Sequence, residues 1–286
     1  KNLLKQLSDA YRKIRNTARF MLGNLHDFDP DTDALPLSKL QQIDLWALHQ
    51  FDMLIDKVEE SYRTYEFHNA YHAIHNFCVV DMSNFYLDVA KDRLYTEKAD
   101  SQTRRAAQTV MFHILSGMTR LVAPILAYTS DEIWKAMRHS KDEDARAVVL
   151  NEFPQKSGVD ADDAFVARWD RIHAIRDDVK KALEKARKQK VIGSSLDAQV
   201  TLYCADELYD FAKSVEKELL PTLIVSAVVI EKDGTGEFTE VELPGFSVTV
   251  SHAEGKKCAR CWMYSNTVGG DPDHPDLCER CAHVLQ

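Results

Sequence analysis

Apolar residues recur every three or four positions along the first part of the chain, a period that predicts amphipathic helices. The first such stripe ends near residue 25, and Pro30 and Pro36 interrupt the pattern that follows it. The positions of this stripe are Leu3, Leu7, Tyr11, Ile14, Ala18, Met21 and Leu25. Arg12, Arg15 and Arg19 share a different face, so the helix is predicted to have a buried side and a cationic side.

Four further helices are predicted before residue 140. The second is expected to start at a Ser38 cap, and the third follows an apolar stripe over residues 67–89. The fourth runs over residues 101–124, and Thr129 with Glu132 forms the pattern of a capping box that opens the fifth. Antiparallel helices joined by short loops are typical of a helix bundle.

The pattern changes after about residue 140. Residues 147–154 read as a short strand, and a long helix is predicted over residues 161–190, ended by Gly193. Three segments rich in β-branched residues then predict strands, with a helix at residues 206–219 between the first two. These strands are placed at residues 199–204, 223–231 and 246–251. The predicted fold class is therefore mainly α, with a helix bundle followed by a small α+β domain.

Composition places the chain among ordinary globular proteins. It has 286 residues, 45% of them apolar, and its formal net charge is -9. Its apolar runs are far shorter than the roughly 20 residues that cross a bilayer, and the N-terminus shows no signal-peptide pattern. We therefore expect a soluble, cytoplasmic protein that has no membrane partner. The first residue is Lys1, inside a predicted helix, so we also expect the sequence to be part of a longer protein.

Positive charge is concentrated in two segments of this acidic chain. Residues 1–26 carry six lysines and arginines against one acidic residue, and residues 171–190 carry eight against three. Such local charge steers anionic partners even when the total charge is negative. The alternative interpretation of both segments is a solvated helix face.

The C-terminal segment contains the pattern of a metal site. Cys258, Cys261, Cys278 and Cys281 have the spacing C-x2-C-x16-C-x2-C, within the range of a four-cysteine zinc ribbon. Four thiolates complete a tetrahedral zinc shell and leave no position for water, so we predict one structural Zn2+ without a catalytic role. Two disulfides or a redox-active pair are the alternatives.

The remaining cysteines and the histidines have less specific surroundings. Cys78 lies on a helical apolar stripe and Cys204 at a strand end, so both are expected in the core. A row of histidines at helical spacing predicts either a helix edge that is half-buried or faces RNA, or a second metal site. Its members are His68, His72 and His75. Three further histidines could replace a cysteine ligand, and these are His252, His274 and His283.

Several stretches, in order along the chain, resemble the C-terminal part of the bacterial isoleucyl-tRNA synthetase family. They are DAYRKIRNTARFMLGNL, MSNFYLDVAKDRLY, APILAYTSDEIW, KVIGSSLDAQV and GKKCARCW. The resemblance covers almost the whole sequence. It implies an anticodon-binding bundle of the class I synthetase type, a junction domain and a zinc-binding module that some DNA glycosylases share. We accordingly expect domains at residues 1–145, 146–250 and 251–286.

The same resemblance implies the activity of the parent enzyme, an isoleucine-tRNA ligase of class I. The HIGH and KMSKS signatures that hold ATP in this family do not occur in the sequence. We therefore expect ATP and Mg2+ to bind only in a catalytic domain absent from this sequence, which should not aminoacylate tRNA by itself. The full-length enzyme is expected to be monomeric.

Isoleucine tRNA is the expected partner, bound at its anticodon stem-loop. The side chains predicted to contact its phosphates are Arg12, Arg15, Arg19, Lys181, Lys185 and Lys188. The resemblance implies that Arg260 and Trp262 of the CARCW motif contact the anticodon side, where an exposed indole would stack on an unpaired base. Trp262 could instead plug the underside of the ribbon, and Arg280 could pair with Glu279 or Asp276.

Two other functions remain open on the sequence alone. One is a protein-interaction scaffold whose zinc ribbon binds a partner, while its basic segments are only solvated. The other is a DNA-binding module that shares the zinc module and has no tRNA specificity.

Overall fold

The computed structural model describes residues 2–239 and 241–286 of the chain. The chain divides into two compact units, Lys1–Asp160 and Ala161–Gln286. Lys1 and the side chain of Leu3, the first position of the N-terminal stripe, lie outside the described residues.

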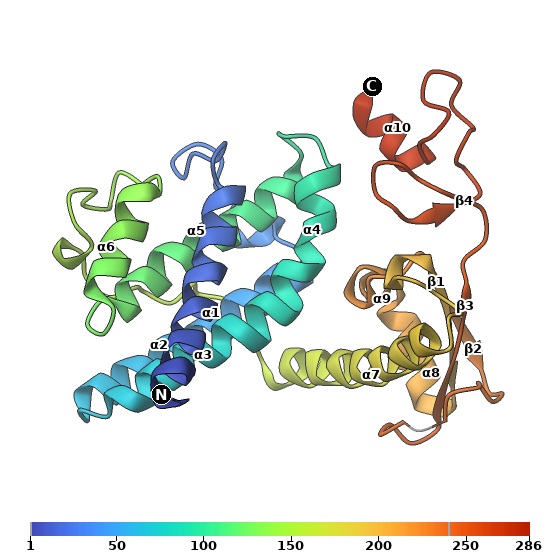
Figure 1. Ribbon diagram of the computed structural model, residues 1–286, viewed down its shortest axis with the longest axis horizontal. Coiled ribbons are helices and arrows are strands. Elements are labelled where there is room, and N and C mark those ends of the chain that lie inside the picture. Colours follow the sequence, from blue (N-terminus) through green and yellow to red (C-terminus); the bar gives the residue numbers. More distant parts are fainter. Residues whose placement is uncertain (1, 240) are drawn as a thin grey trace. The chain divides into compact units, whose positions relative to one another are not determined.

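The first unit is a helix bundle, as the hydrophobic pattern predicts (Figure 1). Its elements are α1 (Asn2–Asn24), α2 (Gln42–Arg63), α3 (Phe67–Asn76), a π-helical segment (Phe77–Tyr86), α4 (Leu87–Thr96), α5 (Gln102–Val122) and α6 (Ala127–Ala136). In α1 the side chains of Ile14, Ala18 and Met21 are almost fully buried, whereas Leu7 is 51% exposed. The apolar stripe of α1 therefore faces the core only from the middle of the helix onward.

Large side chains from α2 and α5 fill the centre of the bundle. Phe51 of α2 is fully buried, and its ring centroid lies 5.7 Å from that of Phe77. Gly117 of α5 lies against the Phe51 ring, because a Cβ at this glycine would come within 2.6 Å of it. The close packing of α2 on α5 thus depends on a residue without a side chain.

Residues 67–96 form one continuous helical run in which α3 passes through the π-helical segment into α4. A buried ion pair anchors this run to α2. Arg93 donates two hydrogen bonds, of 2.8 and 2.9 Å, to the Asp44 carboxylate, and the Tyr86 hydroxyl donates a third of 2.8 Å. Because Asp44 is fully buried, these donors offset the loss of its hydration.

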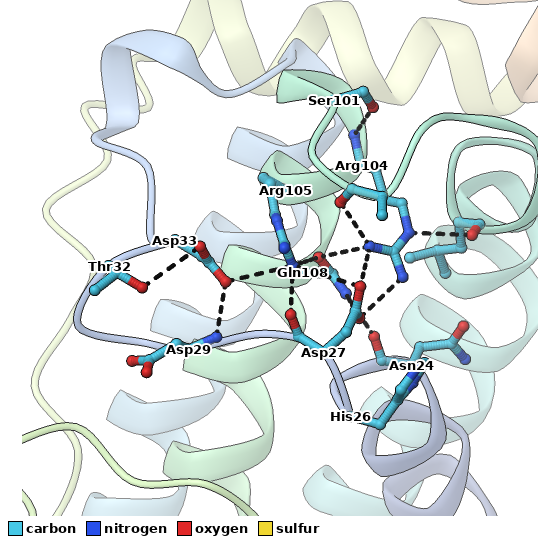
Figure 2. A network of polar contacts seen from close by, with 12 residues as sticks. Asn24, His26, Asp27, Asp29, Thr32, Asp33, Ser101, Arg104, Arg105 and Gln108 are labelled. Carbon is cyan, nitrogen blue, oxygen red and sulfur yellow. Dashed lines mark hydrogen bonds and ion pairs between the residues drawn. The ribbon is translucent and has the colours of Figure 1, made fainter. Parts of the chain in front are cut away.

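A second polar network fixes the loop that follows α1 (Figure 2). Arg104 of α5 donates hydrogen bonds of 2.6 and 2.9 Å to the Asp27 carboxylate, and the Gln108 amide donates another of 2.8 Å. Arg105 lies 3.4 Å from the Asp33 carboxylate and donates to the Asp27 main-chain oxygen. The loop is therefore held on the first turns of α5.

Two predicted helix starts in this unit are wrong. α2 does not begin after Ser38, because Gln41 and Asp44 form the capping box and Ser38 lies in a short 3-10 helix. Thr129 lies inside α6, whose first residue is Ala127, so it is not the cap of that helix.

Residues 147–154 do not form the predicted strand. Val148–Leu150 is a 3-10 helix, and the Asn151 amide donates to the main-chain oxygens of Asp144 and Ala147 at 3.0 and 3.1 Å. These bonds fold the segment back on itself. No strand of the described part of this unit offers it a hydrogen-bonding partner.

The second unit packs three helices against a three-stranded sheet (Figure 1). Its elements are α7 (Asp163–Lys188), β1 (Ala198–Cys204), α8 (Asp206–Ser214), α9 (Glu216–Leu223), β2 (Ala227–Lys232) and β3 (Phe246–His252). The strand order is β2-β1-β3, with β1 parallel to β2 and antiparallel to β3. Alternate residues of β1 are buried, as expected for a strand with one face against the core. The α+β fold of this part is confirmed.

Several boundaries in this unit differ from the prediction, and β2 begins at Ala227 rather than at residue 223, because α9 continues to Leu223. α7 ends before Lys190, and this lysine, rather than Gly193, takes the left-handed conformation, with φ +61°. The Gly193 N–H instead donates to the Asp197 carboxylate at 3.1 Å. The helix predicted at residues 206–219 is two helices that meet at Val215.

The end of the chain contains β4 (Lys256–Lys257), β5 (Tyr264–Ser265) and α10 (Glu279–Leu285). The second compact unit includes both this C-terminal segment and the α+β part, so the division into three domains stays a prediction.

Cys78 and Cys204 are fully buried, each in the core of its own unit. No helix within residues 2–239 and 241–286 is long and apolar enough to cross a membrane.

Candidate metal centre and nucleic-acid interface

Four cysteines converge in the C-terminal segment. Cys258 and Cys261 lie in the turn between β4 and β5, Cys278 directly precedes α10, and Cys281 lies in the first turn of that helix. Their sulfur atoms all lie within 4.8 Å of one another, and all four residues are buried. Among the residues that the structure describes, this is the only group of Cys, His, Asp or Glu side chains arranged to hold a metal ion.

The spacing of these sulfur atoms fits zinc. A Zn–S bond is about 2.3 Å long, so neighbouring sulfurs of a tetrahedral shell lie about 3.8 Å apart. The sulfurs of Cys261 and Cys278 are 3.8 Å apart. A disulfide needs about 2.05 Å, and all four residues are free thiols. The geometry is that of a four-thiolate metal site rather than a covalent cross-link.

Main-chain N–H groups favour the thiolate form of Cys258. Burial raises the pKa of this thiol, but hydrogen bonds from the N–H groups of Cys261, Cys278 and Arg260 outweigh burial and lower it to about 6. Burial, together with the neighbouring sulfurs, raises the pKa of Cys281 well above its usual range. Four thiolates this close repel one another, so a cation is needed to hold all of them deprotonated.

Trp262 projects from the first cysteine turn. Its main-chain N–H donates a hydrogen bond of 3.0 Å to the Cys258 main-chain oxygen, and its φ of +63° is the left-handed conformation of a tight turn. The residue is 63% exposed, so it does not plug the underside of the cysteine cluster. Its neighbour Arg260 is half-buried, and Arg280 contacts the Met263 sulfur at 4.0 Å. Trp262 is therefore presented to solvent next to the cysteine turn.

Contacts of three kinds attach this C-terminal segment to the rest of the second unit. The Tyr264 N–H of β5 donates to the Ser226 hydroxyl at 2.7 Å. The Lys257 ammonium lies 3.5 Å from the carboxylate of Asp197, which immediately precedes β1. The ring of His252, at the end of β3, packs edge-on against the Tyr264 ring at 4.6 Å. The place of the cysteine turn beside the sheet is thus set by specific contacts.

The cations predicted on α1 lie at the surface, and two of them form ion pairs. Arg12 pairs with Asp9, and Arg15 lies 3.0 Å from Glu132 of α6. Arg19 is exposed and forms no ion pair within the described part of the chain. An exposed ion pair contributes only about 0–1 kcal/mol, so Arg12 and Arg15 can exchange these partners for a phosphate.

The three lysines predicted on α7 have different surroundings. Lys181 contacts two carboxylates, of which that of Glu242 is nearer, at 2.6 Å. Lys185 lies over the Phe238 ring, 5.3 Å from its centroid. Lys188 is 3.9 Å from a carboxylate one turn earlier and is mostly exposed. Lys188 is therefore the most available of the three for an anionic ligand, and Lys181 the least.

The structure adds two exposed cations that the sequence interpretation missed. Lys256 and Lys257 form β4 and lie directly before the first cysteine turn. Their only signal in the sequence is their place next to Cys258 in the run GKKC.

The histidine row of α3 does not form a metal site among the described residues. His68 and His72 are exposed, and His75 is half-buried. Burial, together with the nearby His72 and Lys13, lowers the pKa of His75. The positive charge of this ring is therefore disfavoured at pH 7.

Two family models match the chain. The first, an anticodon-binding domain of tRNA ligase, matches residues 44–202, which is more than half of the chain. The chain belongs to this family. The second model, a zinc finger found in FPG and IleRS, matches residues 255–284 and so includes all four clustered cysteines. Both matches confirm the resemblance that the sequence motifs indicated.

Relatives named isoleucine-tRNA ligase match this anticodon-binding chain over its whole length. The protein from Caldanaerobacter subterraneus subsp. tengcongensis is 48% identical over 99% of the chain. Those from Geobacter sulfurreducens and Moorella thermoacetica are each 46% identical, over 99% and 100% of the chain. The chain spans only 31%, 30% and 31% of the lengths of these three relatives.

Proposed function

We propose that this chain is the tRNA-binding part of an isoleucine-tRNA ligase and that it recognises the anticodon stem-loop of isoleucine tRNA. The observation that carries the proposal is the exposed indole of Trp262, which directly follows Cys261 of the cysteine cluster. Membership in the anticodon-binding family and the names of the relatives support tRNA as the partner.

One zinc ion, held by Cys258, Cys261, Cys278 and Cys281, would stabilise this platform. Structural zinc contributes on the order of 10–16 kcal/mol to a small domain that has little apolar surface to bury. Buried apolar side chains are few in this segment, and Leu277 and Ala282 are those beside the cysteines. A closed shell of four thiolates has no open position for water, so the ion takes no part in a reaction.

Trp262 would read the anticodon loop by stacking. Bases of a single-stranded loop are free to lie on an aromatic plane, and such stacking contributes about 1–3 kcal/mol per base. The left-handed backbone of Trp262 directly follows the cysteine turn and sets where its side chain leaves the chain. Arg260, two residues before it, would bind a base edge or a phosphate in the same loop.

Phosphate contacts would come from exposed cations of each unit. Arg19 of α1 is available without breaking an ion pair in the described part of the chain, and Arg12 and Arg15 can exchange their partners. In the second unit Lys188 and Lys185 are better placed than Lys181, which two carboxylates hold. The remaining surface of this acidic chain repels RNA and so confines binding to these regions.

In the whole enzyme, binding at the anticodon would contribute to the specificity of a reaction that takes place elsewhere. ATP and Mg2+ would bind in the catalytic part, which lies outside this sequence. We place the whole enzyme in the cytoplasm and expect it to act as a monomer. The residues described here bind and orient the RNA and carry no step of the chemistry.

A filter-binding assay with isoleucine tRNA and a non-cognate tRNA, at several salt concentrations, tests this proposal. We expect Trp262→Ala to weaken binding of the cognate tRNA about tenfold, which corresponds to the loss of one stacked base. Tyr95→Ala is the matched control, because Tyr95 is also an exposed aromatic residue, at 58%, and has no proposed RNA contact. Zinc content and melting temperature should be unchanged in both variants.

The salt dependence gives a second test of the same proposal. Arg19→Ala should lower the slope of log affinity against log salt by about 0.7–0.9, since one phosphate contact is lost. Lys217→Ala, a change at another exposed cation, should leave the slope unchanged. Equal, weak binding of both tRNAs without a salt slope would contradict the proposal and favour a protein-interaction scaffold.

A further inference from the structure

An aromatic patch lies on the first unit where α2 turns into α3. It consists of Tyr62, Tyr65, Phe67 and Phe153, and we call it the Tyr62 patch. Tyr65 is 81% exposed, Phe67 46% and Phe153 38%. The Tyr62 ring centroid lies 5.6 Å from that of Phe67 and 5.9 Å from that of Phe153, and Tyr65 contacts Phe67 at 6.3 Å. These four rings form one continuous surface.

The patch is held in place rather than loosely exposed. The Tyr62 hydroxyl donates a hydrogen bond of 2.7 Å to the main-chain oxygen of Leu121 in α5. The rings of Tyr62 and Phe153 are stacked, with 9° between their planes. Tyr65 has φ +60°, a left-handed conformation that is unfavourable for a bulky residue. Single exposed aromatic residues are common, but four aromatic residues in contact with one another indicate a binding surface.

A groove beside the patch has an acidic lining. Its residues are Asp56, Glu59, Glu60, Tyr62, Arg63 and Phe153. Glu60 pairs with Arg63, and Asp56 lies 2.6 Å from Lys156. Glu59 is exposed and forms no ion pair within the described residues, and its charge acts on the Lys156 ammonium from a longer distance. The groove therefore combines aromatic faces with three carboxylates, of which that of Glu59 has no cation in direct contact among the described residues.

We propose that this groove binds a protein segment that carries an arginine or lysine between apolar side chains. A guanidinium or ammonium group would lie on the face of Phe153 or Tyr62 and pair with Glu59, because aromatic faces attract cations. The flanking apolar side chains would cover Tyr65 and Phe67. RNA does not fit, since its phosphates would meet the carboxylates of the groove.

The probe is a ten-residue peptide of alternating arginine and leucine, and its counterpart is the same peptide with glutamate in place of arginine. Binding to the complete 286-residue chain is measured by calorimetry, and the contact site by NMR of the tyrosine and phenylalanine rings. The arginine peptide should bind saturably and shift the Tyr65 and Phe153 signals. The glutamate peptide should bind at least tenfold more weakly.

Variants at this site and matched variants elsewhere distinguish binding at this site from nonspecific electrostatic binding. Tyr65→Ala should weaken binding of the arginine peptide about fivefold, and Glu59→Gln about threefold. Tyr128→Ala and Glu207→Gln should leave it unchanged, because Tyr128 is a 95% exposed tyrosine outside the patch and Glu207 an exposed carboxylate of the second unit. Tyr65 of the patch and Glu59 of the groove are both exposed, so these variants keep the fold, which a thermal melt verifies.

Four outcomes would overturn the proposal. Equal binding of the two peptides would show that the cation is not recognised. Equal binding of the arginine peptide by Tyr65→Ala and by the unchanged chain would show that the patch is not the binding site. A shift of the Tyr65 signal by isoleucine tRNA would assign the surface to RNA. A dimer in sedimentation that Tyr65→Ala abolishes would assign it to a second copy of the chain.

Discussion

The Tyr264 N–H donates a hydrogen bond of 2.7 Å to the Ser226 hydroxyl, which in turn donates to the main-chain oxygen of Leu196. One serine hydroxyl thereby joins the C-terminal segment to the chain that leads into β1. This contact is one of those that place the proposed zinc platform beside the sheet.

Ser226→Ala should loosen the C-terminal segment without removing its metal site. The Tyr264 N–H would lose its acceptor, and an unsatisfied donor at a partly buried site costs about 1–2 kcal/mol. Hydrogen exchange of the Tyr264 amide should become at least tenfold faster, while zinc content stays at that of the unchanged chain. Ser214→Ala, which removes a local bond on an exposed helix end, is the control and should change stability by less than about 0.5 kcal/mol.

Loss of one cysteine ligand should unfold the C-terminal segment. Cys258→Ser removes a thiol whose pKa the surrounding main-chain N–H groups lower, and excess chelator should have the same effect on the unchanged chain. We expect residues 254–286 to become sensitive to protease while the rest of the second unit stays resistant. Cys204→Ala removes a buried cysteine outside the cluster and should retain one zinc per chain. Full zinc retention by Cys258→Ser would contradict the proposed ligand set.

The Asp27 network of Figure 2 should make the first unit sensitive to acid. The hydrogen bond from Arg104 outweighs burial and holds the pKa of Asp27 well below its ordinary value of 3.8. A carboxyl whose pKa falls on folding stabilises the folded state above its unfolded pKa and loses that contribution as the pH falls below it. Asp27→Asn should lower the free energy of unfolding by about 2 kcal/mol at pH 7 and weaken its decline below about pH 4.

Asp81 of the π-helical segment provides the opposite case. Burial raises the pKa of Asp81 to about 6, so the folded state binds its proton more tightly and loses stability as the pH rises from about 4 to 6. Asp81→Asn should therefore raise the free energy of unfolding by about 1 kcal/mol at pH 7, allowing for partial exposure. Denaturant unfolding at pH 4 and pH 7 measures Asp81→Asn, and a further measurement at about pH 2 tests Asp27→Asn, since the Asp27 contribution is lost below about pH 4. Equal effects of Asp81→Asn at pH 4 and pH 7 would contradict the assignment.

Two glycines in helices should respond in opposite directions to alanine. A Cβ at Gly117 would lie 2.6 and 2.7 Å from atoms of the Phe51 ring, so Gly117→Ala should cost about 1–3 kcal/mol through overpacking. A Cβ at Gly23 of α1 meets nothing within 4 Å, and Gly23→Ala should stabilise by up to about 1 kcal/mol through helix propensity. Thermal melts of the two variants measure these changes. A Gly117→Ala variant as stable as the unchanged chain would show that the Phe51 ring can move aside.

Local sequence patterns predicted most of the helices and strands, but they failed where contacts formed on folding determined the local structure. Ser38 has the side chain of a helix cap, yet Asp44 takes part in the capping box of α2 and also binds Arg93 across the core. Residues 147–154 have the composition of a strand, yet a strand needs a neighbour, and Asn151 folds the segment on itself instead. Gly193 has the usual signal of a helix end, but Lys190 takes the left-handed position.

Two features of this protein follow from the sequence alone. The period of the apolar residues determines the bundle, because a stripe along one helix face must be buried, and the spacing of four cysteines determines a tetrahedral sulfur cluster, because two short turns suffice to form it. The tertiary structure alone decided that Trp262 is exposed, that Ser226 and Asp197 hold the cysteine turn beside the sheet, and that Phe153 joins the patch at Tyr62. Exposure and contacts between residues far apart in the chain depend on how whole elements pack, and no local pattern of residue types encodes that packing.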